Sequence, residues 1–192
     1  MLAPGSPASG GDTGQAQQVP DQRFAKGTYS SPHGEFTLKC DDFLAPGIRV
    51  LESRADSATT AVQFVFGFGQ VYLVFLTPDA PDSQTVAKLS QDFKLDESLR
   101  DKRIITTGRG SELRLLGVTR GGSPAVTQTK VGDTWVEKPN DLYQAWSIFR
   151  DHHAIYRVAA EITPLEAGSD SLMMERAKAK LESLLRGLVI RP

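Results

Sequence analysis

Residues 61–77, AVQFVFGFGQVYLVFLT, constrain the fold of this chain more than any other stretch. Two runs rich in aromatic and β-branched residues flank a glycine-containing connection, a pattern that favours strands joined as a hairpin. The stretch is interrupted by Gln63, Gln70 and two glycines, so it falls short of the roughly 20 apolar residues of a membrane-spanning helix. We therefore expect two strands, at 61–66 and 71–77, and no membrane span here.

Several other short segments have the same β-strand character. They are GEFTLKC (34–40), GIRVLES (47–53), SELRLLGVTR (111–120), AVTQTKV (125–131), LYQAWSIF (142–149) and AIYRVAAEI (154–162). We expect 111–120 to form a hairpin with 125–131 around GGSP, and 142–149 to form one with 154–162. Because hairpins join antiparallel neighbours, the sheet should be mainly antiparallel.

Two segments have helical spacing instead. Val86, Leu89 and Phe93 recur at intervals of three and four, after Asp82 or Ser83 as a cap, and this helix should end before RDKR (100–103). A C-terminal helix follows GSDS (168–171), and Gly187 is its expected end. Its expected apolar side consists of Met174, Ala177, Leu181, Leu184, Leu185 and Leu188. Strands and helices together indicate an α+β fold with helices packed on the sheet.

Both ends of this pattern resemble PsbP-like proteins. The resemblance rests on YSSPHGEFTLKC with Gly34 before a strand, and on YQAWSIFRDHHAIYRVAAEI followed by AKAKLESLLRGLVI. That superfamily includes an extrinsic photosystem subunit, a nuclear import factor that binds the GTPase Ran, bacterial lipoproteins and secretion chaperones. The resemblance spans roughly residues 28–190. It implies an α/β/α sandwich, with one mainly antiparallel sheet flanked by helices, and a binding or assembly role, but it transfers no functional residue.

Composition and charge narrow the partners and the compartment. The chain has 22 Lys and Arg against 23 Asp and Glu, and this near balance of charges does not favour nucleic acid or an anionic membrane as a partner.

Residues 1–21 are rich in Gly, Pro, Ser and Gln, and we expect a disordered tail before a single domain at 22–192. One interpretation of the tail is the spacer after the acylated cysteine of a bacterial lipoprotein, which would limit membrane contact to an upstream lipid anchor. The other is a cloning remnant. The lipoprotein interpretation places the protein in the periplasm or cell envelope, and a cytoplasmic location is the alternative.

The motif FRDHHAIY (149–156) contains the three letters, Asp151, His152 and His153, that name a family of metal-dependent phosphoesterases. Such enzymes need several carboxylates and imidazoles around one or two ions, whereas adjacent residues on a strand point to opposite faces. No upstream aspartate motif accompanies the three letters. We therefore expect a hairpin turn, no catalytic residue and no cofactor. Together with His33, the three residues remain the weak candidates for a metal site.

The expected turn has Asp151 and His152 as its two loop residues. Phe149 would then pair with Ala154, and Trp146 with Arg157. Trp146 and Arg157 would lie side by side on one face of the sheet, within reach of a cation–π contact. The other face would carry Tyr143, Phe149, Tyr156 and Val158.

Three further features each have a functional and a simpler structural explanation. Trp135 lies in the polar, loop-like segment VGDTWVEKPND, where it either marks a recognition surface for a protein partner or packs back onto the body. Asp79 and Asp82 are residue types of an acid–base pair, but their neighbouring prolines indicate a turn. Cys40, the single cysteine, precedes two aspartates whose charges disfavour a thiolate, so we expect it to be inert.

These observations favour a non-enzymatic binding or assembly protein of the bacterial cell envelope, with a protein partner and Trp135 as the candidate contact. The sequence names neither that partner nor an oligomeric state. One alternative is a metal-dependent phosphoesterase or other hydrolase that uses Asp151, His152 and His153. The other is a secretion chaperone or adaptor.

Overall fold

The computed structural model describes residues 17–18, 24–25, 27–39, 49–54, 59–66, 69–92, 98–123, 126–164 and 169–191. Its elements in chain order are β1 (Gln17–Gln18), β2 (Phe24–Ala25), β3 (Thr28–Ser30), β4 (Phe36–Lys39), β5 (Arg49–Arg54), β6 (Thr60–Phe66), β7 (Gln70–Thr77), α1 (Val86–Asp92), β8 (Leu99–Thr107), β9 (Gly110–Thr119), β10 (Val126–Val131), β11 (Thr134–Pro139), β12 (Leu142–Asp151), β13 (Ala154–Ile162), α2 (Asp170–Gly187) and β14 (Leu188–Ile190).

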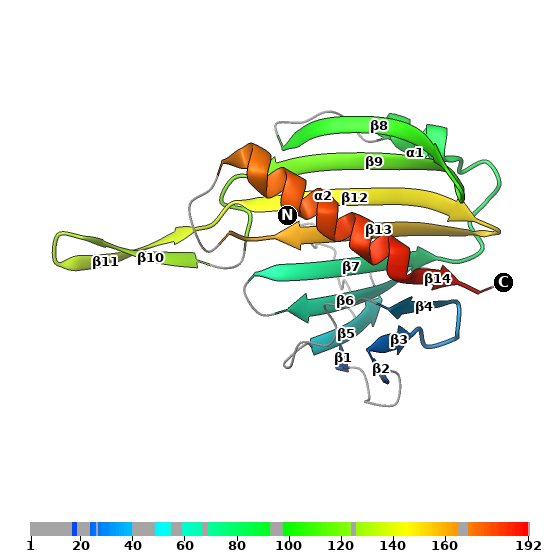
Figure 1. The fold of residues 1–192 in the computed structure, drawn as a ribbon, viewed down its shortest axis with the longest axis horizontal. Coiled ribbons are helices and arrows are strands. Elements are labelled where there is room, and N and C mark those ends of the chain that lie inside the picture. Colours follow the sequence, from blue (N-terminus) through cyan, green and yellow to red (C-terminus); the bar gives the residue numbers. More distant parts are fainter. Residues whose placement is uncertain are drawn as a thin grey trace, which may run out of the picture.

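One antiparallel sheet forms the body, and α2 lies obliquely across one of its faces (Figure 1). The strand order in this sheet is β1-β5-β6-β7-β13-β12-β9-β8. A smaller antiparallel sheet, β14-β4-β3-β2, lies beside it, and β10 pairs with β11 alone as a projecting hairpin. The strongly apolar strands β6 and β7 are therefore interior strands of the large sheet, as their composition requires.

The main core lies between α2 and the sheet. Ser169 caps α2 by accepting a hydrogen bond from the Leu172 amide at 3.3 Å, as the GSDS pattern predicts. The helix ends at Gly187, also as expected, but for an unexpected reason. A Cβ at Gly187 would lie 1.5 Å from the Lys39 carbonyl oxygen, so glycine is required for the close approach of α2 to β4. The buried side chains of α2 are Met173, Ala177, Leu181, Leu184 and Leu185, with Met173 taking the place expected for Met174.

A buried carboxylate links the sheet to the end of α2. Glu112 on β9 is fully buried, and its Oε2 accepts hydrogen bonds from Arg114 Nη2 at 2.8 Å and from Ser147 Oγ at 2.9 Å. Arg114 Nη1 continues to Glu182 of α2 at 2.9 Å. Arg109 donates to the Leu185 carbonyl at 2.6 Å, where unpaired helix carbonyls need donors. These contacts hold the C-terminal end of α2 over β9 and β12.

The opposite face of the sheet is covered differently. A smaller cluster there joins α1 to the sheet through Val86, Leu89, Leu113, Ile148 and Ile155. Since α1 has only seven residues, it covers one part of this face.

The expected α/β/α sandwich is therefore wrong. Of the described residues, 56 % are in strands and 18 % in helices, and these helices are α1 and α2, so the protein is mostly β. The error arose because two segments without clear strand alternation, β8 and β11, are strands. β8 (LRDKRIITT) is an edge strand whose charged residues hide its period, and β11 belongs to an exposed hairpin.

Pairing of the middle segments also differs from expectation. β9 pairs with β8 and β12, whereas β10 pairs with β11, so the expected hairpin of 111–120 with 125–131 does not form.

The first turn of α1 is capped by Thr85, whose Oγ1 accepts a hydrogen bond from the Lys88 amide at 3.2 Å, in place of Asp82 or Ser83. Phe93, Cys40 and most of the expected tail at 1–21 lie outside the described residues; within that tail, Gln17–Gln18 pairs with β5.

Candidate functional site

Asp151, His152 and His153 lie at the turn between β12 and β13, as predicted, but the two-residue loop begins one residue later than expected. The strands pair Asp151 with Ala154, so His152 and His153 are the two loop residues. His152 has φ of 50°, a left-handed conformation that histidine tolerates better than most residues.

The later turn changes every cross-strand pair. Phe149 pairs with Tyr156 and Trp146 with Ala159, so the expected pairs with Ala154 and Arg157 are wrong. Trp146 is half-buried and stacks on Phe75 of β7, with ring centroids 6.1 Å apart. The expected face is confirmed, because Tyr143, Phe149, Tyr156 and Val158 all belong to the main core.

Arg150 fixes this turn to a second one. Its guanidinium donates to the carbonyls of Ala80 and Pro81 at 2.8 and 2.7 Å and to the carboxylate of Asp82 at 2.8 Å. The Ala80 amide in turn donates to the His153 carbonyl at 2.6 Å. Asp82 is therefore a structural residue of the turn after β7, as its neighbouring prolines suggested, and the same turn brings Asp79 close to the histidines.

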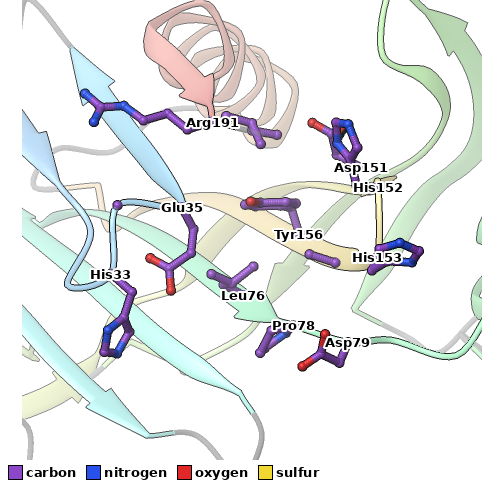
Figure 2. A pocket seen from close by; sticks show the side chains of 13 residues that line it. His33, Glu35, Leu76, Pro78, Asp79, Asp151, His152, His153, Tyr156 and Arg191 are labelled. Atoms are coloured by element: carbon purple, nitrogen blue, oxygen red, sulfur yellow. Dashed lines mark ion pairs between the residues drawn. The ribbon is translucent and has the colours of Figure 1, made fainter.

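A pocket of about 300 Å³ opens between these turns and the turn before β4. The chain has three histidines, and all of them, His33, His152 and His153, line this pocket. Figure 2 shows His33 on one side and the His152–His153 turn on the other. Asp151 also lines the pocket, so the structure brings together all four residues considered as metal candidates.

Tyr156 forms part of the pocket wall between the two groups of histidines (Figure 2). Its ring is held rigidly, stacked on Phe149 with centroids 5.4 Å apart and edge-on to Phe36. Burial, together with the nearby carboxylates of Asp151 and Glu35, raises the pKa of Tyr156 to about 12. The phenol therefore stays protonated at neutral pH.

The four candidates are spread over the pocket and do not converge on a point. Asp151 Oδ1 lies 2.8 Å from His152 Nδ1, so these two residues pair with each other. Within the part of the chain that the structure describes, no three His, Cys, Asp or Glu side chains are grouped so that they could hold one metal ion. This arrangement lacks the ligand set that a metal-dependent hydrolase needs.

The second candidate, Trp135, lies on β11 and not in a loop. Its side chain is 63 % exposed, so it does not pack back onto the body. Val131 and Val136 of the same hairpin are 62 % and 45 % exposed. Alternation along β11 places Trp135 and Val136 on opposite faces, and Val131 pairs with Thr134 on the face of Val136. The projecting hairpin therefore exposes apolar side chains on both faces.

Sequence reasoning missed Glu35 and Tyr156 as pocket residues and Glu112 as a buried carboxylate. Glu35 follows the motif HGE, and nothing in its local sequence connects it with residues 151–156. Tyr156 was assigned correctly to the core face, and only the structure shows that its hydroxyl end reaches a pocket. Glu112 was detectable as a lone carboxylate in the apolar alternation of LRLLGV, but its burial depends on the pairing of β9 with β12.

Comparison with protein-family models and with curated proteins found no match to this chain. The resemblance to PsbP-like proteins therefore remains a prediction from sequence. Neither described helix has the length and apolarity that crossing a membrane requires.

Proposed function

We propose that this protein is a non-enzymatic binding protein that engages a protein partner through the β10–β11 hairpin. The observation that carries the proposal is the exposure of Trp135 on a hairpin that pairs with none of the other described strands. Tryptophan is among the side chains that contribute most to binding at protein interfaces. An isolated two-stranded hairpin is only marginally stable in water, so burial against a partner would stabilise it.

The shape of the hairpin narrows the kind of partner. Three of the six large apolar side chains exposed by the described residues lie on it, namely Val131, Trp135 and Val136. Since they occupy both faces, a flat partner surface would cover only part of them. The proposed partner therefore has a cleft that admits the hairpin tip, with an apolar pocket for the indole.

The location we propose for this interaction is the bacterial cell envelope. Support comes from the Gly-, Pro-, Ser- and Gln-rich residues 1–21, which suit the spacer of a lipoprotein. A hydrolase is less well supported, because the described His, Cys, Asp and Glu residues form no metal cluster.

The test uses a photo-reactive side chain in place of Asp133 at the hairpin tip. In cell extract it should give one discrete cross-linked product, and adding Trp135→Ala should reduce the yield severalfold. Val189→Ala is the matched control, because Val189 is 56 % exposed on β14, at the opposite end of the molecule from the hairpin (Figure 1), and this change should leave the yield intact. Equal yields with Trp135→Ala and with the control would overturn the proposal.

A second measurement uses the protein's two tryptophans. Trp146→Phe leaves Trp135 as the only indole, and its emission should shift to the blue when the purified partner is added. Light scattering over a range of protein concentrations tests whether the partner is a second copy of this chain. An unchanged emission spectrum in a complex of confirmed mass would place the contact elsewhere.

A further inference from the structure

The pocket at the β12–β13 turn carries a surplus of negative charge. Its carboxylates come from three separate segments: Glu35 before β4, Asp79 after β7 and Asp151 at the end of β12. Arg191 also lines the pocket, but Figure 2 shows its guanidinium pointing away from the other labelled side chains. Three carboxylates and one guanidinium therefore line the pocket, and the guanidinium points away from the carboxylates.

Tyr156 provides an independent indication of a ligand. Its side chain is only 2 % exposed, and no hydrogen bond joins its hydroxyl to a described residue. Figure 2 shows the phenol oxygen on the side of the pocket nearest Glu35. The ring lines the pocket, so a ligand there that donates a hydrogen bond would find the phenol oxygen as an acceptor.

The histidines add further acceptors. When His152 donates through Nδ1 to Asp151, the neutral imidazole presents Nε2 as an acceptor. Carboxylates, neutral imidazoles and a phenol oxygen all accept hydrogen bonds from a cationic N–H group. The chemistry of the lining therefore matches a ligand that is positively charged and rich in donors.

The spacing of the acceptors selects the size of that ligand. The described His, Asp and Glu residues do not converge closely enough to hold a metal ion. The volume of about 300 Å³ lies instead at the lower end of the range for small organic ligands. Glu35 and Asp151 lie on opposite sides of the pocket, and Asp79 lies apart from both, beside Pro78 (Figure 2). A cation that bridges Glu35 and Asp151 needs two charged ends and a short flexible body.

We propose that this pocket binds a small aliphatic diamine or polyamine, with one ammonium group against Glu35 and another against Asp151. The Tyr156 hydroxyl and the His152 imidazole accept hydrogen bonds from the ligand. The site is separate from the partner contact proposed above, because the β10–β11 hairpin and the β12–β13 turn lie at opposite ends of the molecule (Figure 1).

The three histidines make a direct test possible, since every histidine of the chain lines this pocket. Putrescine added to the whole protein should shift the imidazole NMR resonances of His33, His152 and His153 in a saturable way. Butylamine and Nα-acetyl-lysine amide each carry one ammonium group and should bind about fivefold more weakly, the factor that about 1 kcal/mol represents. 1,4-Butanediol should produce no shift.

Variants locate the two ammonium positions. Glu35→Gln and Asp151→Asn should each weaken putrescine binding about fivefold, while the imidazole spectrum of the free protein keeps its dispersion. Glu175→Gln removes the same charge from the exposed surface of α2 and should leave binding unchanged. Tyr156→Phe removes only the hydroxyl and should also weaken binding.

Three results would overturn the proposal. The first is no histidine shift with millimolar putrescine. The second is equal affinity for putrescine and either monoamine, which would show that a single ammonium group, such as a lysine side chain, is what the pocket takes. The third is a saturable shift with Zn²⁺ that putrescine does not reproduce.

Discussion

Glu112 offers the sharpest test of how this fold is held together. The carboxylate is fully buried and accepts hydrogen bonds from Thr107 Oγ1 at 2.7 Å, Ser147 Oγ at 2.9 Å and Arg114 Nε at 3.0 Å. Glu112→Gln keeps the size of the side chain, so it leaves no cavity. It removes the negative charge and replaces one acceptor oxygen by an NH₂ donor that faces other donors.

The cost follows from what the substitution leaves behind. The side chain of Arg114 is only 12 % exposed, and after the substitution its remaining partner is the half-exposed Glu182. Breaking a buried ion pair by removing one partner typically costs about 3–5 kcal/mol. We expect Glu112→Gln to lower the free energy of unfolding by that amount, a large part of the roughly 5–15 kcal/mol of a typical domain.

Urea titration followed by circular dichroism measures this loss. Asp101→Asn is the control, because Asp101 pairs with Arg103 at 3.5 Å and both side chains are about half exposed. That change should cost no more than about 0.5 kcal/mol. The double variant Glu112→Met with Arg114→Met should be less destabilised than the sum of the single changes, since no buried charge is left unpaired. If the free energy of unfolding of Glu112→Gln lies within about 1 kcal/mol of the wild-type value, the network does not hold α2 in place. This margin is larger than the ~0.3–0.5 kcal/mol resolution of such comparisons.

Three other predictions concern single positions. Gly187→Ala should cost about 3 kcal/mol or more in urea titration, because its methyl group would meet the Lys39 carbonyl. Burial raises the pKa of Glu161, so the native state holds a proton more tightly than the unfolded chain does. Wild-type stability therefore falls as the pH rises from the pKa of this group in the unfolded chain to its raised pKa in the native state. Glu161→Gln should therefore be more stable than wild type at pH 7, and the difference should vanish when both are compared below pH 4. His152→Gly should raise the thermal midpoint slightly by removing a left-handed non-glycine residue, and a lower midpoint would contradict this account of the turn.

The alternation of apolar residues predicted the faces of the β12–β13 hairpin correctly while the predicted register was wrong. The expected and observed turns both contain two residues, and the observed turn starts one residue later. Moving a turn by one residue changes each pair by two positions, which keeps the same side chains on the same face. Only a change of one position would exchange the faces. The pattern therefore specifies the core, whereas the backbone conformation accessible to His152 decides the pairs.

Strands at the margins of the fold escaped prediction for a different reason. β8 is an edge strand, and Arg100, Asp101, Lys102 and Arg103 give it no apolar face. Charged side chains are common on edge strands because they discourage pairing with other chains. β11 has exposed side chains on both faces, so burial imposes no alternation on its sequence. Tertiary position, and not local propensity, makes these segments strands.

The candidate site combines residues whose sequence separation hides their proximity. His33 and Glu35 reach the pocket because β4 pairs with β14, and the Arg191 amide after β14 donates to the Glu35 carbonyl at 2.9 Å. Asp79 reaches it because Arg150 holds the turn after β7 against the β12–β13 turn. The motif at residues 151–153 marked the right place on the chain, but the charges that define the pocket come from elsewhere.

The β10–β11 hairpin should be removable without loss of the fold. It is inserted between β9 and β12, and the chain closes beneath it through a hydrogen bond from the Ser123 amide to the Asn140 carbonyl at 3.0 Å. The Asp141 carboxylate strengthens this closure by accepting hydrogen bonds from the Gly121 amide and the Arg120 guanidinium. Both bonds lower the pKa of Asp141, and the bond from the Gly121 amide has the larger effect.

Replacing residues 124–139 by Gly-Gly should therefore keep a cooperative unfolding transition, since the described side chains of this segment, residues 128 and 131–137, are exposed. The shortened protein should lose its cross-linked partner, because the exposed Trp135 is gone. It should still show the putrescine-induced shifts of all three histidines, because the pocket lies at the other end of β12. If the shortened chain unfolds, the hairpin is part of the structural core; if it folds and retains the partner, the contact lies on another surface of the protein.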